Sequence, residues 1–238
     1  MRWDVHYVER TGSTNSDLLA LAREGAPPGT TLRAGHQTAG RGRLGRTWEA
    51  PPGSSLLASI LLEAEPAPFV TVARVALAAA DACHDLAGVD PDLKWPNDLV
   101  IGDRKLAGLL AEADAGSPTV AVGIGCNVAW PPQAELPAEL RDLVVALSWV
   151  ATDPPGPEAL LDGLLRRLDD WLARAPDEVL GAYRGRCATL GAAVRVELPH
   201  GTLEGTATGI TSSGELEVLS GTATQVVRSG DVVHVRAR

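Results

Sequence analysis

The sequence predicts an α+β protein in which a mixed β-sheet with flanking helices precedes a small all-β module. Up to about residue 186, apolar runs typical of strands alternate with segments whose apolar residues recur at helical spacing. After about residue 187, five short, partly alternating apolar runs are separated by turns rich in Gly and Ser. We therefore expect two domains, residues 1–186 and residues 187–238.

The elements of the first part follow from apolar patterns and end signals. Strands are expected over residues 3–10, 30–37 and 54–63. Helices are expected over residues 13–25 and 69–86, each with one apolar face. Thr14 with Asp17 three residues later has the spacing of a capping pair, and Gly25 and Gly88 each stand at a helix end.

The middle of the chain continues the sheet. Short strands are expected over residues 93–95, 98–101 and 105–113, the last two joined by a Gly-Asp turn typical of a hairpin. Residues 119–130 are apolar without alternation, so this strand should be central. Two proline-rich segments bracket an expected helix over residues 138–149. A later helix has one apolar face, made of Leu160, Leu164, Leu165, Leu168, Trp171 and Leu172.

The terminal module should contain five strands, over residues 194–198, 205–210, 215–219, 224–227 and 232–236. A module of about fifty residues buries little apolar surface alone, so we expect it to pack on the preceding domain.

Composition narrows the class of protein. The net charge of −9 argues against binding nucleic acid independently of its sequence. The longest apolar run is too short to cross a bilayer and the first residues resemble no secretory signal, so we expect a cytoplasmic protein without membrane contact. Cys83, Cys126 and Cys187 are far apart in sequence, which favours reduced, buried thiols over a disulfide framework or a zinc site.

A basic loop, "GRGRLGRTW" at residues 40–48, contains three glycines and three arginines. Its glycines fit G-x-G-x-x-G, but Pro51 and Pro52 leave no room for the helix that a dinucleotide-binding turn must open. Two readings stay open. The loop is either a solvated, mobile segment or an anion site built from backbone N–H groups and guanidinium groups, with Trp48 as a stacking surface.

The neighbouring motifs favour a ligand site. "KWPNDL" places Asn97 and Asp98 at a strand end, where they could bind a ligand or a hydrated metal ion, or serve as turn formers. "KLAG" and "GIGCN" place glycines inside strands, where glycine is otherwise costly. Of 21 basic residues only Lys94 and Lys105 are lysine, which indicates either a specific role for them or an arginine-rich composition.

Together, "STN", "HQTAGRGRLGRTW", "KWPNDL", "RKLAG" and "GIGCNV" resemble, in order and spacing, the biotin protein ligases, also called biotin–[acetyl-CoA-carboxylase] ligases. The resemblance is close over residues 11–130 and looser over the terminal module. It implies a catalytic domain like that of the class II aminoacyl-tRNA synthetases, followed by an SH3-like β-barrel.

The resemblance also implies the reaction. Biotin and ATP, with Mg²⁺, would give biotinyl-AMP and pyrophosphate. A lysine of a biotin carboxyl carrier protein domain, part of acetyl-CoA carboxylase or a related carboxylase, would then take the biotin and release AMP.

Site residues carry over position by position from the family. The resemblance implies that biotin is bound by Ser13, Thr14, Asn15, Gln37, Gly40, Arg41, Gly42, Arg43, Lys105, Gly108 and Gly123. It implies that ATP and the adenylate are bound by Arg43, Arg46, Trp48, Lys94, Asn97 and Asn127. Lys105 and Arg43 are the expected catalytic residues, and Asp98 is the candidate metal ligand.

Departures and alternatives remain. Cys126 stands where the family often has a larger aliphatic residue. The sequence begins almost directly at the catalytic motifs, so we expect neither the winged-helix domain of bifunctional members nor repressor activity. A lipoate or octanoate ligase would carry a different glycine-rich signature, and a non-catalytic biotin-binding protein would lack Lys105 or the loop arginines. Whether the protein is a monomer or a homodimer stays open.

Overall fold

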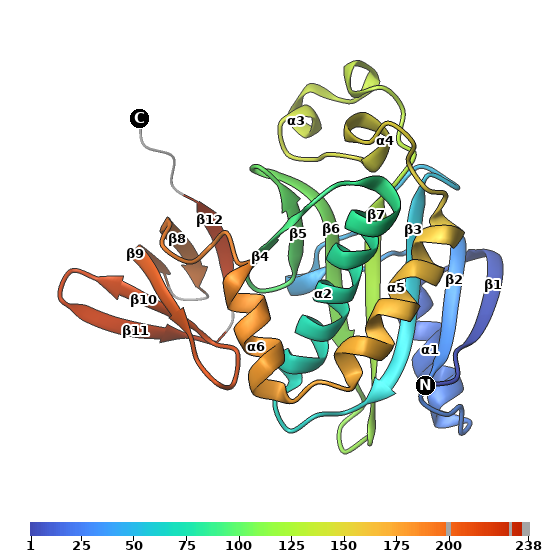
Figure 1. Cartoon of the computed structure of the whole chain (residues 1–238), viewed down its shortest axis with the longest axis horizontal. Helices are drawn as coiled ribbons and strands as arrows, with labels where there is room; N and C mark the ends of the chain where they lie inside the picture. Colours follow the sequence, from blue (N-terminus) through green and yellow to red (C-terminus); the bar gives the residue numbers. More distant parts are fainter. Residues whose placement is uncertain (199–200, 229, 235–238) are drawn as a thin grey trace.

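Two β-sheets organise the chain, which a computed structural model describes over residues 1–198, 201–228 and 230–234 (Figure 1). The first sheet contains β1 (Asp4–Thr11), β2 (Thr30–Gln37), β3 (Ser55–Glu63), β4 (Asp92–Lys94), β5 (Asp98–Ile101), β6 (Arg104–Glu112) and β7 (Thr119–Asn127). Its strand order is β1-β2-β3-β7-β6-β5-β4. β1 and β2 are parallel and the other neighbours antiparallel, so the sheet is mixed, as predicted.

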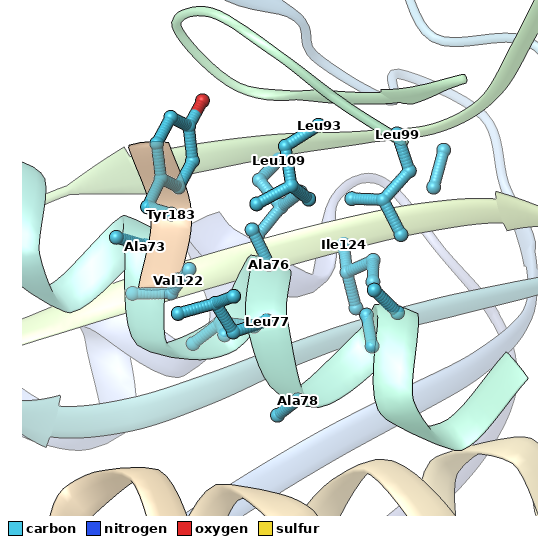
Figure 2. Packing of buried hydrophobic residues seen from close by; sticks show 14 of the residues in the cluster. Ala73, Ala76, Leu77, Ala78, Leu93, Leu99, Leu109, Val122, Ile124 and Tyr183 are labelled. Atoms are coloured by element: carbon cyan, nitrogen blue, oxygen red, sulfur yellow. The ribbon is translucent and has the colours of Figure 1, made fainter. Parts of the chain in front are cut away.

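The helices are α1 (Thr14–Arg23), α2 (Pro68–Ala87), α3 (Ala138–Arg141), α4 (Leu147–Val150), α5 (Pro157–Leu172) and α6 (Pro176–Gly185). Figure 1 shows α2 and α5 side by side over one face of the large sheet. The small side chains of Ala73, Ala76 and Ala78 let α2 pack closely on its neighbours, and Figure 2 shows Ala76 beside Leu93 and Leu109 of the strands. Fully burying one such leucine stabilises the fold by about 2 kcal/mol.

The opposite face of the sheet carries α1. Leu18 of α1 packs on Leu61 of β3 and Ala121 of β7, in a cluster separate from the main core. Because side chains alternate along a strand, every second residue from these two shares their face. Ser59, paired with Gly123, is on this face, and the functional site described below is built there.

The second sheet contains β8 (Ala193–Leu198), β9 (Gly201–Ile210), β10 (Leu216–Ser220), β11 (Ala223–Val227) and β12 (Asp231–His234). Its order is β11-β10-β9-β8-β12 and all pairs are antiparallel, which agrees with the expected SH3-like module. The last expected strand ran to residue 236, and residues 235–236 lie outside the described part of the chain.

The second sheet packs against the first domain, as its small size predicts. The Trp95 indole Nε1 donates to the Gly214 carbonyl at 2.9 Å, and the Arg184 guanidinium donates to the Ile210 carbonyl at 2.6 Å. The domain boundary at residues 186–187 stays a prediction.

Two expectations about helices were wrong, and one helix was not predicted. Residues 138–149 form two single turns, α3 and α4, instead of one helix, because the chain between them pairs with the sheet: Lys105 N donates to the Leu143 carbonyl at 2.8 Å and Val145 N to the Lys105 carbonyl at 2.9 Å. The short helix α6 was not predicted. α1 begins after Ser13 without a side-chain cap, since Asp17 accepts a hydrogen bond from Thr11 instead.

Candidate active site

One cavity on the α1 face of the large sheet gathers most of the predicted site residues. Its lining comes from the start of α1, the end of β2, the basic loop, the middle of β3, the turn before β5, and β6 and β7. The predicted residues in this lining are Ser13, Thr14, Asn15, Gln37, Arg41, Gly42, Arg43, Arg46, Trp48, Asn97, Asp98, Lys105, Gly108 and Gly123. Gly40, Lys94 and Asn127 are outside it. Gly230, just before β12, also contributes, so the chain that leads into β12 reaches the cavity.

The inner end of the cavity is polar and buried. Thr14 N and Oγ1 both donate to the Gln37 Oε1 atom, at 2.7 and 3.0 Å. Since Oε1 is the acceptor, the Gln37 amide nitrogen points away from Thr14 and remains a donor. The fully buried Ser59 hydroxyl lies 2.7 Å from Thr14 Oγ1 and 2.5 Å from Asn15 Oδ1.

The orientation of the Asn15 amide is fixed by two acceptors. Asn15 Nδ2 donates to the Leu110 carbonyl at 3.1 Å and to Glu112 Oε2 at 2.8 Å. The carbonyl oxygen Oδ1 therefore faces Ser59 and the backbone of Gly123. The result is a rigid set of acceptors and hydroxyls at the start of α1, with about 4% of Asn15 exposed.

Glycines form the floor of the cavity. Gly108 of β6 is paired with Gly125 of β7, and Leu110 with Gly123. A Cβ at Gly123 would lie 2.5 Å from Asn15 Oδ1, and a Cβ at Gly125 would lie 2.3 Å from the Trp48 ring atom Cε2. These strands need glycine because other side chains of the site lie directly on their backbone.

The basic loop is folded back on itself. Arg41 pairs with Thr47, Gly42 N donates to the Arg46 carbonyl at 2.7 Å, and Trp48 N donates to the Gly40 carbonyl at 2.9 Å. Glycine is required at position 40 by the close approach of Trp48, because a Cβ there would lie 2.5 Å from the Trp48 carbonyl oxygen. The loop thus presents its arginines to the cavity from a closed turn, in place of the open cradle of a nucleotide-binding fold.

Positive charge from three directions converges on the cavity. Arg41 Nη2 lies 2.8 Å from Glu112 Oε2, and Arg43 Nη1 donates to Asn97 Oδ1 at 3.2 Å. Lys105 Nζ lies 2.8 Å from Asp98 Oδ1 and 5.3 Å from the centre of the Trp48 ring. Such an arrangement can hold two anions close together, since fixed cations offset their mutual repulsion.

Asn127 and Lys94, which the sequence assigned to the nucleotide, lie outside the cavity lining and contact other parts of the protein. Asn127 is buried, and its Nδ2 donates to the carbonyls of Lys105 and Val145 at 3.3 and 3.0 Å. It thereby ties the segment after α3 to the strand that carries Lys105. Lys94, in β4, lies near His234 of the second sheet, whose pKa is lowered by burial and then by the charge of Lys94.

Sequence reasoning missed Ser59 and Glu112, whereas it had noted Gly125 as a glycine inside a strand without assigning it to a ligand. The sequence could have indicated Glu112, because residues two apart in a strand point to the same face of the sheet. Glu112 therefore shares a face of β6 with Gly108 and Leu110. It also missed Tyr183, which α6 brings into the core (Figure 2). Burial raises the pKa of Tyr183 well above its ordinary value, and the charge of Asp98 raises it further, while Arg43 opposes this.

The cysteines are buried and unpaired, as expected. The neighbouring Cys83 thiol, followed by burial, raises the pKa of Cys126, and burial raises the pKa of Cys187. A raised pKa lowers the thiolate fraction at neutral pH, so these thiols are poor nucleophiles.

Within the described residues, no group of three or more His, Cys, Asp or Glu side chains is arranged to hold a metal ion. Asp98 is the one carboxylate in the described lining of the cavity, and its Oδ1 atom faces Lys105. The site therefore fits a metal ion held chiefly by phosphate oxygens and water. No helix in the described part of the chain is long and apolar enough to cross a membrane.

Comparison with known proteins agrees with this geometry. The Biotin/lipoate A/B protein ligase family matches residues 7–129, and the Biotin protein ligase C terminal domain matches residues 189–235. The chain is 40% identical to a biotin–[acetyl-CoA-carboxylase] ligase of Mycobacterium tuberculosis, over 96% of this chain and 88% of the relative. It is 31% identical to the enzyme of that name from Paracoccus denitrificans, over 94% of this chain and 98% of the relative.

Among solved structures, the biotin protein ligase from Aquifex aeolicus in complex with biotin and ATP superposes with a TM-score of 0.84. The two are 26% identical, and the match covers 98% of this chain and 99% of the other. The resemblance seen in the sequence is thus confirmed over nearly the whole chain, and the protein belongs to the biotin protein ligase family.

Proposed function

We propose that the protein is an ATP-dependent biotin protein ligase, which makes biotinyl-AMP and transfers biotin to a lysine of a biotin carboxyl carrier domain. The observation that carries this proposal is the continuity of one cavity. A buried hydrogen-bonding end at the start of α1 leads, across a glycine floor, to a cluster of arginines and a lysine.

The buried end suits the ureido ring of biotin. That ring presents two N–H donors and one carbonyl acceptor. Asn15 Oδ1 supplies an acceptor, while the hydroxyl of Ser13 and the amide nitrogen of Gln37 supply donors. A site that must hydrogen-bond a polar ring rejects ligands that lack it, because its own buried groups would be left unpaired.

The charged end suits the first reaction step. An oxygen of the biotin carboxylate attacks the α-phosphorus of ATP, and the bond to the leaving pyrophosphate breaks. Both reactants are anions, so Arg41, Arg43 and Lys105 must offset their repulsion before any bond forms. Trp48, on the floor beside Lys105, offers a flat surface to the adenine.

In the second step the uncharged amine of the carrier lysine attacks the acyl carbon of biotinyl-AMP. An amide bond forms and the bond from the acyl carbon to the phosphate oxygen breaks. AMP leaves, and the amine nitrogen gives up one of its two protons. The adenylate must be protected from water until then, and the loop that bears Arg41 and Arg43 lies at the position to do this.

Magnesium is part of this proposal as the ion that accompanies the nucleotide phosphates and lessens their charge. Asp98 is the side chain that would contact it, as one ligand among phosphate oxygens and water. We further infer a cytoplasmic enzyme, because its three cysteines are unpaired and ATP is its co-substrate.

The test is biotin transfer to a biotin carboxyl carrier domain of an acetyl-CoA carboxylase, followed by intact mass spectrometry. The reaction contains the enzyme, ATP, Mg²⁺ and biotin, and its control is a carrier whose acceptor lysine is replaced by arginine. The proposal predicts one biotin per carrier and none on the control. Transfer of octanoate or lipoate in place of biotin would refute it.

A further inference from the structure

We propose that Glu112 is a positioning residue that couples the biotin-binding end of the cavity to the basic loop. The inference rests on the function proposed above. One carboxylate oxygen, Glu112 Oε2, accepts a hydrogen bond from Asn15 Nδ2 at 2.8 Å and from Arg41 Nη2 at 2.8 Å. It thus links a residue at the start of α1 to the second residue of the loop.

Glu112 lies at the edge of the cavity, on the face of β6 that also carries Gly108 and Leu110. It is the last residue of β6, paired with Ala121 of β7, and is absent from the cavity lining, whereas Asn15 and Arg41 are both part of it. A carboxylate in this place touches no ligand directly. Its effect on the reaction must pass through the two side chains that it holds.

Each of the two contacts has a distinct effect. The contact with Asn15 helps to keep the amide nitrogen turned to β6, so that the amide oxygen faces the pocket side near Gly123. The contact with Arg41 is charge-assisted and restrains the guanidinium, which lines the cavity, together with the start of the basic loop. Side-chain exposures of 27% for Glu112 and 43% for Arg41 leave the pair open to partial screening by solvent.

The shared oxygen makes the two subsites interdependent. When biotin fixes the Asn15 amide, the Glu112 carboxylate is fixed too. Glu112 in turn holds Arg41, the second residue of the basic loop. Loss of the Glu112 carboxylate should therefore have two effects at once: it should weaken biotin binding and release Arg41 of the basic loop from its restraint. It should change the turnover rate less, since Lys105 and Arg43 keep their own partners, Asp98 and Asn97.

The experiment compares Glu112→Ala and Glu112→Gln with the wild type. Biotin binding is measured by calorimetry without ATP, and biotin-dependent pyrophosphate release is measured with ATP and Mg²⁺. We expect Glu112→Ala to raise the Kd and the KM for biotin about tenfold to a hundredfold while kcat falls much less. Glu112→Gln keeps an acceptor oxygen without the charge, so it should restore part of the affinity.

A matched control is Asp114→Asn. Asp114 lies two residues further on and forms an exposed ion pair with Arg23 at 2.7 Å, away from the cavity. It should leave biotin affinity unchanged. A double-mutant cycle with Arg41→Ala tests the coupling, because Glu112→Ala should have a smaller effect once Arg41 is gone.

The outcomes separate the two proposals. If the wild type does not bind biotin, the proposed function fails. If the wild type binds biotin and Glu112→Ala binds it equally well, or lowers kcat as strongly as it raises KM, the positioning role of Glu112 is refuted. A melting temperature within a few degrees of the wild type excludes general unfolding as the cause.

Discussion

Replacing Gly125 by alanine should damage nucleotide use with little effect on stability. The added methyl carbon would lie 2.3 Å from Trp48 Cε2 and 2.6 Å from its Nε1 atom. Ordinary contact begins near 3.4 Å, so the indole must retreat by about 1.1 Å or more. Trp48 is half-buried and belongs to the exposed loop, so the loop can take up this movement.

The size of the effect follows from that displacement. A misplacement of about 1 Å in a group that orients a reactant can lower the rate about a hundredfold, equivalent to about 2.7 kcal/mol. We therefore expect kcat/KM for ATP to fall by about two orders of magnitude. The melting temperature should change by only a few degrees, because no core residue has to move.

Gly123→Ala, two residues away on the same strand, is the informative contrast. Its methyl carbon would lie 2.5 Å from Asn15 Oδ1, in a network that Ser59 and Glu112 hold rigid. Overpacking of this kind costs about 1–3 kcal/mol, or roughly 2–12 °C of melting temperature in a chain of this size. Gly123→Ala should weaken biotin binding more than it lowers kcat/KM for ATP.

The assay is pyrophosphate release at varied ATP and varied biotin, with melting temperatures measured by scanning calorimetry. Gly185→Ala is the control, because nothing lies within 4 Å of a Cβ at that position. If Gly125→Ala keeps its kcat/KM for ATP within twofold of the wild type, or if it destabilises as much as Gly123→Ala, the assignment of Trp48 to the nucleotide is wrong.

Three further predictions concern stability and reactivity. Tyr183→Phe should leave the melting temperature unchanged or raise it slightly, because the buried hydroxyl has no hydrogen-bond partner among the described residues; a fall of more than about 3 °C would reveal one. Burial, and then the charge of Lys94, lowers the pKa of His234 in the folded protein below the ordinary value of 6.5. The contribution of the neutral His234 to stability is therefore fully present above about pH 6.5, and it is lost as the pH falls through the pKa of the folded state. The urea midpoint should accordingly drop more between pH 7.5 and 5.5 in the wild type than in His234→Gln, and equal drops would contradict the assignment. A disulfide reagent should label Cys126 and Cys187 only after unfolding, since both thiols are buried with raised pKa values; rapid labelling of the native protein would disagree.

Much of the site could be predicted because its chemistry is local in sequence. Gly108 and Gly123 interrupt strands at positions where glycine is costly, which points to a close approach by something else. The basic loop contrasts with an acidic chain, and its arginines do face the cavity. These signals depend on single residues and their near neighbours, so the sequence alone carries them.

Other features depend on the tertiary structure. Glu112 meets Arg41, 71 residues away, only because β6 ends beside the loop. Residues 142–146 have helical spacing, yet their backbone finds partners on Lys105, and this pairing overrides local propensity. Asn127 falls in a family motif but ties two backbone segments together, a role that no local pattern indicates.

The measurement that tests the account most directly is pyrophosphate release from ATP and Mg²⁺, with and without biotin, in the wild type and in Lys105→Ala. The substitution leaves the backbone hydrogen bonds of Lys105 in place, so the fold should persist. We predict biotin-dependent release that falls about a hundredfold or more in the variant. Pyrophosphate release at the same rate without biotin, or at the same rate in Lys105→Ala as in the wild type, would contradict the assignment of adenylate chemistry to this cavity.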